Sequence, residues 1–125
     1  MRTALRSPLL HMAVAFVAMG GWAVLANWSH PMPRPLIAGV MQGSISALIT
    51  LGLKRMIEWV AARLPGAAAV IGPPVAAVAI SAALLTVLHR LAGTPEIART
   101  IAVPLSVTAI YATGYALALR RSRHG

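Results

Sequence analysis

The chain of 125 residues contains no cysteine and no aspartate, and its two acidic residues are both glutamates. The absence of cysteine excludes disulfides, thiolate metal sites and cysteine nucleophiles. Charged residues of all kinds make up only 10% of the chain, whereas they make up about a quarter of an ordinary soluble domain. The chain therefore has too few polar side chains to cover the surface of a water-soluble domain of this size.

Apolar residues are abundant instead. Hydrophobic residues make up 58% of the chain, and its mean hydropathy is +0.77. They fall into four blocks, each close to the roughly 20 residues that a helix needs to cross the hydrocarbon core of a bilayer. The four predicted spans are residues 9–28, 36–53, 67–88 and 101–119. The sequence thus predicts an all-α membrane protein, a single domain over residues 1–125 that forms a small up-and-down bundle of four transmembrane helices.

Proline and glycine mark the connections between these spans. Three prolines in residues 29–35 predict a short, stiff linker. Residues 64–66 form a breaker after an amphipathic extension over residues 54–63. Residues 93–96 predict a helix stop, then Thr94 as the N-cap of a fourth helix that begins near Pro95. Gly72-Pro73-Pro74 predicts an interruption of the third span.

The basic residues predict the orientation of the bundle. Eight of the eleven lysines and arginines lie on one side of the predicted spans and three on the other. The positive-inside rule then places both termini in the cytoplasm. Arginine and alanine usage suggests a GC-rich bacterial genome, and hence a multi-pass protein of the bacterial cytoplasmic membrane. The first side holds Arg2, Arg6, Lys54, Arg55, Arg63, Arg120, Arg121 and Arg123, and the second holds Arg34, Arg90 and Arg99.

Two alternatives arise from these features. The net charge of +9 is compatible with nucleic-acid binding, but the basic residues bracket apolar blocks instead of lining a polar face, which argues against it. The first block has a loose signal-peptide cleavage pattern at Val24-Leu25-Ala26. Its apolar stretch is long for a signal peptide and leads at once into another span, so we expect it to be a retained helix.

The second span carries a stripe of small and polar residues. These residues recur at spacings of three and four, so they share one face of a helix. Small residues let helices approach closely in lipid, and a buried amide there needs a partner. We expect this stripe to be a helix-packing seam, with a solute pathway as the alternative. The stripe consists of Gly39, Gln42, Gly43, Ser46, Ala47 and Thr50.

The fourth span offers further polar groups for the interior of the bundle. Thr108 and Tyr111 lie well inside it, whereas Tyr115 lies near its end, where an interfacial anchor is usual. We expect Tyr111 to make a specific contact, with Gln42 as the candidate partner. The first span similarly places Trp22 deep in the membrane.

The predicted outer face collects histidines and arginines around the two turns there. Such a set could hold the phosphate or carboxylate of a lipid head group, assisted by the start of the fourth helix. The alternative is a solvated rim in which Glu96 pairs with Arg90 or Arg99. Two histidines and one glutamate without a ligand spacing predict no metal site. The residues concerned are Asn27, His30, Arg34, His89, Arg90, Glu96 and Arg99.

No catalytic pattern accompanies these features. Glu58 follows Lys54 and Arg55 at helical spacing, which predicts an interfacial ion pair. No carboxylate lies at a span centre, where coupled transporters commonly need one. The sequence therefore predicts a protein that is not an enzyme and has no cofactor. We expect a packing or accessory subunit, as a homo-oligomer or within a larger membrane complex in contact with membrane lipids. The alternative is a small translocator of lipids or amphiphiles, flippase-like or channel-like, that uses the outer arginines.

Overall fold

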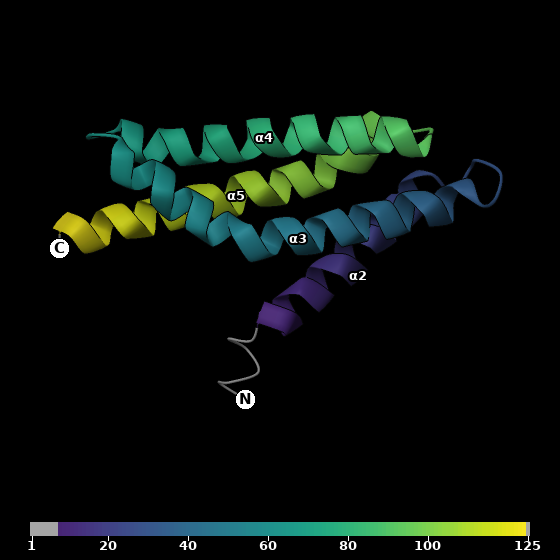
Figure 1. Ribbon diagram of the computed structural model, residues 1–125, viewed down its shortest axis with the longest axis horizontal. Coiled ribbons are helices and arrows are strands. Elements are labelled where there is room, and N and C mark those ends of the chain that lie inside the picture. Colours follow the sequence, from purple (N-terminus) through teal and green to yellow (C-terminus); the bar gives the residue numbers. More distant parts are fainter. Residues whose placement is uncertain (1–7, 125) are drawn as a thin grey trace.

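The computed structural model describes residues 8–124, which form four long helices joined by short turns (Figure 1). Arg2 and Arg6, which contribute to the predicted orientation, lie outside the described residues. Each helix is longer than the span predicted from hydropathy, except the first. The helices are α2 (Pro8–Ala26), α3 (Arg34–Arg63), α4 (Ala68–Ala92) and α5 (Ile97–His124).

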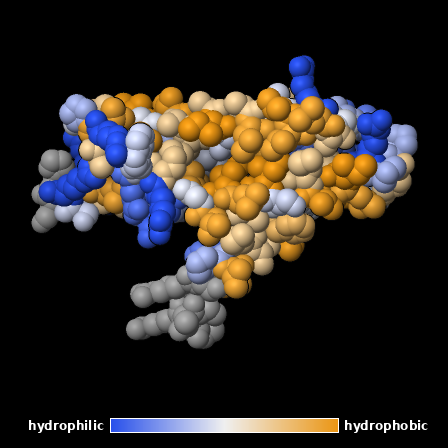
Figure 2. Space-filling model, in the orientation of Figure 1, coloured by the Kyte–Doolittle hydropathy of each residue, from blue (hydrophilic) through white to orange (hydrophobic). Residues whose placement is uncertain are grey.

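All four helices are long and apolar enough to cross a membrane. Their outward faces carry large apolar side chains, such as Leu91 and Ile110, which are 79% and 74% exposed. In Figure 2 this apolar surface covers the middle of the molecule, and hydrophilic residues gather toward its two ends. Lipid satisfies such a surface and water does not. The predicted fold class, an all-α up-and-down bundle of four membrane helices, is confirmed.

Helices α3 and α5 each pack against the other three helices, and α3 packs most extensively against α2. Helix α2 packs against α3 and α5, and among the described helices it makes no direct contact with α4. Figure 1 shows α3, α4 and α5 running alongside one another, whereas α2 diverges from them toward its N-terminal end. The contacts of α2 are therefore concentrated in its C-terminal half.

The bundle has two chemically different ends. We call the end with the α2–α3 and α4–α5 turns the rim. The opposite end, called the basic end below, holds the α3–α4 turn and the last turns of α5. Gly66 and Gly93 have positive φ angles of 55° and 74° in the α3–α4 and α4–α5 turns, a conformation that favours glycine. The described basic residues at the basic end are Lys54, Arg55, Arg63, Arg120, Arg121 and Arg123.

The prolines do not divide the helices in the way the sequence predicts. Helix α4 continues through Pro73 and Pro74, so the predicted interruption of the third span is wrong. Pro104 likewise lies inside α5. Membrane helices tolerate proline because neighbouring helices and local backbone adjustment satisfy the freed carbonyls. The fourth helix begins at Ile97, two residues after the predicted Pro95.

One cluster of buried apolar side chains lies in the half of the bundle near the basic end. Ile57 of α3, Ala77 of α4, and Ala112 and Ala116 of α5 form this cluster, each no more than 1% exposed. Three of the four are alanines, whose small side chains let helix backbones approach closely in lipid. The half of the bundle near the rim also buries apolar residues, and it buries a set of hydrogen-bonded polar side chains as well.

Candidate functional site: buried polar contacts near the rim

Helices α2 and α3 cross through glycines. A Cβ atom on Gly20 would lie 2.8 Å from the carbonyl oxygen of Gly39, and one on Gly43 would lie 2.8 Å from the carbonyl oxygen of Phe16. A Cβ on Gly39 would overlap the side chain of Val24. The backbones are therefore too close for a larger residue at Gly20 and Gly43, and at Gly39 the Val24 side chain occupies the space.

The rest of the predicted stripe on the second span is distributed around this crossing. Gln42 and Ser46 are buried, whereas Ala47 and Thr50 are half-buried. Gln42 is fully enclosed, and its Nε2 donates a hydrogen bond of 2.8 Å to the hydroxyl of Ser46 one turn later. The glycines of the stripe thus face α2, whereas the side-chain amide of Gln42 points away from α2.

The Gln42 amide is directed at α4, where it meets His89. His89 Nε2 lies 2.8 Å from Gln42 Oε1, and His89 Nδ1 lies 2.7 Å from the hydroxyl of Thr94. His89 and Gln42 are both 0% exposed. A neutral imidazole with its hydrogen on Nε2 fits both bonds, because it donates to the amide oxygen and accepts from the hydroxyl. The four residues form one chain of hydrogen bonds, from Ser46 through Gln42 and His89 to Thr94.

The end of α4 holds Thr94 in place over His89. Gly93 has a left-handed conformation, its N–H donates to the Arg90 carbonyl, and the Thr94 N–H donates to the His89 carbonyl at 2.9 Å. This pair of bonds is a Schellman motif, which satisfies the last carbonyls of a helix. The prediction that Thr94 caps α5 is wrong, because its hydroxyl is used by His89 of the preceding helix.

The start of α5 is capped by Asn27, the residue that directly follows α2. The Asn27 side-chain oxygen accepts a 2.9 Å hydrogen bond from the Glu96 N–H. Its Nδ2 donates to the Thr100 hydroxyl at 2.7 Å and to the Ala23 carbonyl at 2.8 Å. Asn27 and Thr100 are both fully buried. The amide therefore uses both donors and one acceptor lone pair: one donor binds the end of α2, and the other groups join that end to the start of α5.

Two further contacts tie the turns of the rim together. His30 Nε2 lies 3.0 Å from Glu96 Oε2, in a half-exposed pair. Arg34 Nη1 donates a 2.6 Å hydrogen bond to the Gly93 carbonyl. The solvated-rim alternative predicted that Glu96 pairs with Arg90 or Arg99, and this pairing does not form among the described residues. His30 reaches Glu96 across the two turns instead.

These contacts change the set of residues available to an external ligand at the rim. His89 was predicted at the rim surface, but it is buried between α3 and α4, so it cannot contact a head group. His30, Arg34 and Glu96 already contact other parts of the chain. Arg90 and Arg99 are exposed, and the Arg99 backbone carbonyl accepts a hydrogen bond from Trp22 Nε1 at 3.1 Å. Trp22 therefore lies beside the first turn of α5, close to the rim.

The predicted contact between Tyr111 and Gln42 is absent from the described structure. Tyr111 is 44% exposed and stacks on Tyr115, with ring centroids 5.9 Å apart. The Tyr115 hydroxyl donates a 2.5 Å hydrogen bond to Glu58, so Glu58 joins α3 to α5 and does not form the predicted ion pair with Lys54 or Arg55. The prediction failed because depth along a helix does not determine which face a residue occupies.

The interior near the polar contacts is closed. Thr108 is 9% exposed, and within residues 8–124 no buried side-chain nitrogen or oxygen lacks a hydrogen-bond partner. One hollow lies at the basic end and an apolar one lies on the outward face of α3, next to Leu36 and Val40. Neither is lined by Gln42, His89 or Tyr111. Within the same residues, no cluster of three or more His, Asp or Glu side chains could hold a metal ion.

The sequence does not indicate the roles of three residues in these contacts. It places Asn27 only among the rim residues, predicts Thr94 as the cap of the fourth helix and gives no role to Thr100. One signal was available for Asn27, because an amide at the end of an apolar span requires partners. No sequence signal indicates that Thr100 is that partner.

Comparisons with known proteins identify no related protein. No family model matches the chain, and no curated protein or solved structure matches it. The fold and its apolar surface nevertheless define the class of protein. The chain is a four-span helical membrane protein.

Proposed function

We propose that this protein is a non-enzymatic packing or accessory subunit of the membrane, and that it works as a homo-oligomer or within a larger membrane complex. The observation that carries the proposal is the use of the polar residues. Gln42, His89, Asn27 and Thr100 all bind other helices of the same chain. None of them is left to bind a substrate.

The closed interior supports the same proposal. A translocator needs a polar path or cavity along its helices, whereas Gln42 is fully enclosed and bonded on both sides of its amide. The outward faces are apolar along all four helices, which suits contact with lipid or with other membrane helices. We further propose that both termini lie in the cytoplasm of a bacterial cell, because most of the basic residues lie at the basic end.

The test is native mass spectrometry of the protein released from a mild detergent. The proposal predicts a species with more than one polypeptide, either several copies of this chain or this chain with a second protein. The measurement is repeated over a tenfold dilution to separate stable assemblies from chance occupancy of one micelle. A chain that is monomeric at every concentration and purifies with no other polypeptide contradicts the proposal.

A second candidate function is a small translocator of lipids or amphiphiles, and the two free rim arginines favour it. Arg90 and Arg99 are exposed, and no described carboxylate lies within ion-pairing distance of either. Their guanidiniums are available to an anionic head group. Arg99→Ala should then reduce the anionic lipid that co-purifies from the rim without loss of folding. Arg121→Ala at the basic end is the control, and equal lipid loss in both variants would remove this candidate.

A further inference from the structure

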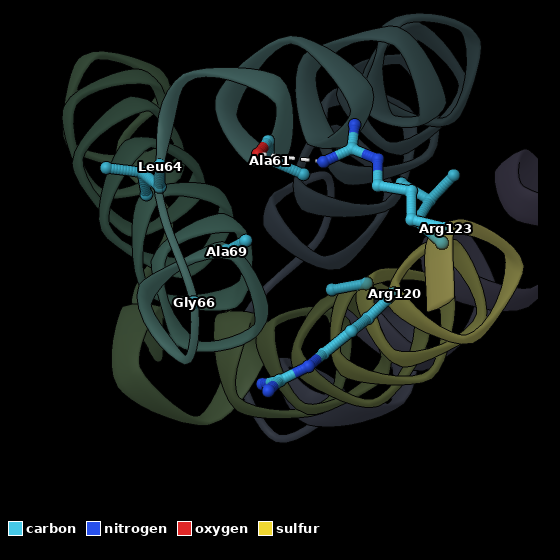
Figure 3. A pocket seen from close by; sticks show the side chains of 8 residues that line it. Ala61, Leu64, Gly66, Ala69, Arg120 and Arg123 are labelled. Atoms are coloured by element: carbon cyan, nitrogen blue, oxygen red, sulfur yellow. Dashed lines mark hydrogen bonds between the residues drawn. The ribbon is translucent and has the colours of Figure 1, made fainter. Parts of the chain in front are cut away.

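The hollow at the basic end has features of a binding site that the contacts near the rim lack. It has a volume of about 70 Å³ and lies where the end of α3, the start of α4 and the end of α5 meet (Figure 3). Two of its lining residues, Arg120 and Arg123, come from α5. In Figure 3 their guanidiniums lie on opposite sides of the hollow, Arg123 toward Ala61 of α3 and Arg120 toward the start of α4.

These two arginines have little to neutralise them. Arg123 Nη1 makes one long hydrogen bond of 3.4 Å to the Ala61 carbonyl, and Arg120 has no described hydrogen-bond or ion-pair partner. The nearest candidate acid in sequence, Glu58, accepts the hydrogen bond of Tyr115. The basic end has six described lysines and arginines, and Glu58 is its one described acidic side chain. The hollow therefore lies in a strongly positive region.

The start of α4 adds to this positive potential. Gly66 and Ala69 line the hollow, and α4 begins between them at Ala68. The first N–H groups of this helix are not free, because Ala68 donates to the Pro65 carbonyl and Ala69 to the Gly66 carbonyl, each at 3.2 Å. The helix dipole nevertheless places partial positive charge at this end, which favours an anion. Two guanidiniums and the positive end of a helix dipole thus lie around one small hollow.

We propose that this hollow binds the phosphate-bearing head group of an anionic lipid. The remaining walls are apolar and include Leu64 and Leu119. A polar wall of guanidiniums beside an apolar wall matches a phosphodiester followed by the first carbons of its acyl chains. Basic pockets between membrane helices hold anionic head groups in this way. The hollow is small, at about 70 Å³, and this size suits a phosphate group.

This proposal does not depend on the proposed function, because the site lies at the opposite end of the bundle from the rim and uses other residues. Membrane lipid is favoured over free phosphate, since the walls beside the two arginines are apolar side chains such as Leu64 and Leu119. Inorganic phosphate shares the head-group chemistry and is therefore included as a separate arm of the test.

The test measures lipid binding to the purified full chain by native mass spectrometry. Phosphatidylglycerol is titrated into the protein in a mild detergent, and phosphatidylcholine is titrated in parallel. The double variant Arg120→Gln/Arg123→Gln removes the two guanidiniums of the hollow. The matched control, Arg55→Gln/Arg121→Gln, removes two exposed charges from the same end that do not line the hollow. Thermal unfolding followed by circular dichroism monitors the folding of each variant.

The wild type should retain phosphatidylglycerol in preference to phosphatidylcholine. The hollow variant should bind phosphatidylglycerol at least about tenfold more weakly, because the loss of one charge-assisted hydrogen bond raises the dissociation constant by about that factor. The control should lose clearly less binding than the hollow variant, because Arg55 and Arg121 do not line the hollow and contribute only general attraction to anionic lipid. Equal losses in the two double variants, or no loss in either, would overturn the proposal.

A second variant keeps the proposal testable if the double variant unfolds. Ala69→Met fills the hollow and leaves every charge in place, so it should also weaken phosphatidylglycerol binding. Retention of full binding by a folded Ala69→Met protein would overturn the assignment to this hollow. Displacement of the lipid by inorganic phosphate at an equal concentration would show that the site takes free phosphate, which would overturn the assignment to a lipid.

Discussion

Gln42 of α3 and His89 of α4 are joined by a hydrogen bond of 2.8 Å between Oε1 and Nε2, and neither side chain is exposed. Both side chains make a second bond as well, Gln42 to Ser46 and His89 to Thr94. In a bilayer no water is present to replace these bonds. The pair therefore fixes the register of α3 against α4 in the half of the bundle near the rim.

Replacement of Gln42 by leucine should destabilise the bundle by about 1–3 kcal/mol, since it leaves the buried His89 N–H without an acceptor. Unfolding by a denaturing detergent measures this change. The double variant Gln42→Leu/His89→Leu should recover part of the loss, because neither side of the Gln42–His89 bond is then left unpaired. The recovery is only partial, since the buried hydroxyls of Ser46 and Thr94 still lose their partners. Strictly additive effects of the two substitutions would contradict a direct bond between these residues.

The crossing of α2 and α3 gives a prediction with an adjacent control. Gly20→Ala places a Cβ 2.8 Å from the Gly39 carbonyl oxygen, so it should destabilise the protein by about 1–3 kcal/mol. Gly21→Ala meets nothing within 4 Å and should be neutral or stabilising by up to about 1 kcal/mol. Both variants are compared by their thermal unfolding in the same detergent. Similar melting temperatures for the two would mean that this crossing does not form.

Asn27 should control the first turn of α5 from outside that helix. Asn27→Ala removes the acceptor of the Glu96 N–H and both side-chain bonds to Ala23 and Thr100. We expect a loss of about 1–3 kcal/mol and faster hydrogen exchange at the Glu96 amide. Ser29→Ala, at an exposed position two residues later, is the control and should leave exchange unchanged. Protection of the Glu96 amide in Asn27→Ala at the wild-type level would contradict the capping role.

The orientation of the protein is open to a direct test. The basic end should face the cytoplasm, because it holds most of the lysines and arginines. Reporter fusions after Gly125 and within residues 29–35 should therefore report opposite sides of the membrane, with the C-terminal fusion cytoplasmic. Fusions that report the same side would contradict the four-span topology, and a C-terminal fusion outside the cytoplasm would contradict the orientation.

The fold was largely predictable from the sequence, because it depends on properties that single segments carry. Apolar length identified the four spans, and the breakers at residues 64–66 and 93–96 ended the helices close to where the structure ends them. Gly72-Pro73-Pro74 was misleading, since neighbouring helices can satisfy the carbonyls that proline frees. Whether they do so is a property of the packed bundle and not of the segment.

The polar contacts were only half predictable, for a related reason. The need of Gln42 for a partner follows from its chemistry, but the identity of that partner depends on how α3 is rotated about its axis. The positions of Tyr111 and His89 along their helices would let either residue reach Gln42. Only the packing of the helices places His89 against Gln42 and turns Tyr111 outward. The pairing of Glu96 with His30 instead of an arginine likewise depends on how the two turns approach each other.

The central claim is that the polar interior joins helices and offers no path to water, and cysteine labelling at Ser46 tests it most directly. The chain has no cysteine, so Ser46→Cys, Ser29→Cys and Ser122→Cys each introduce a single thiol. Ser46 is 7% exposed, whereas Ser29 and Ser122 are exposed at the rim and the basic end. In membranes opened to both sides, a charged methanethiosulfonate reagent should modify Cys at positions 29 and 122 and leave position 46 unmodified. Modification at position 46 as fast as at the two ends would reveal a water-filled pathway beside Gln42 and contradict the account.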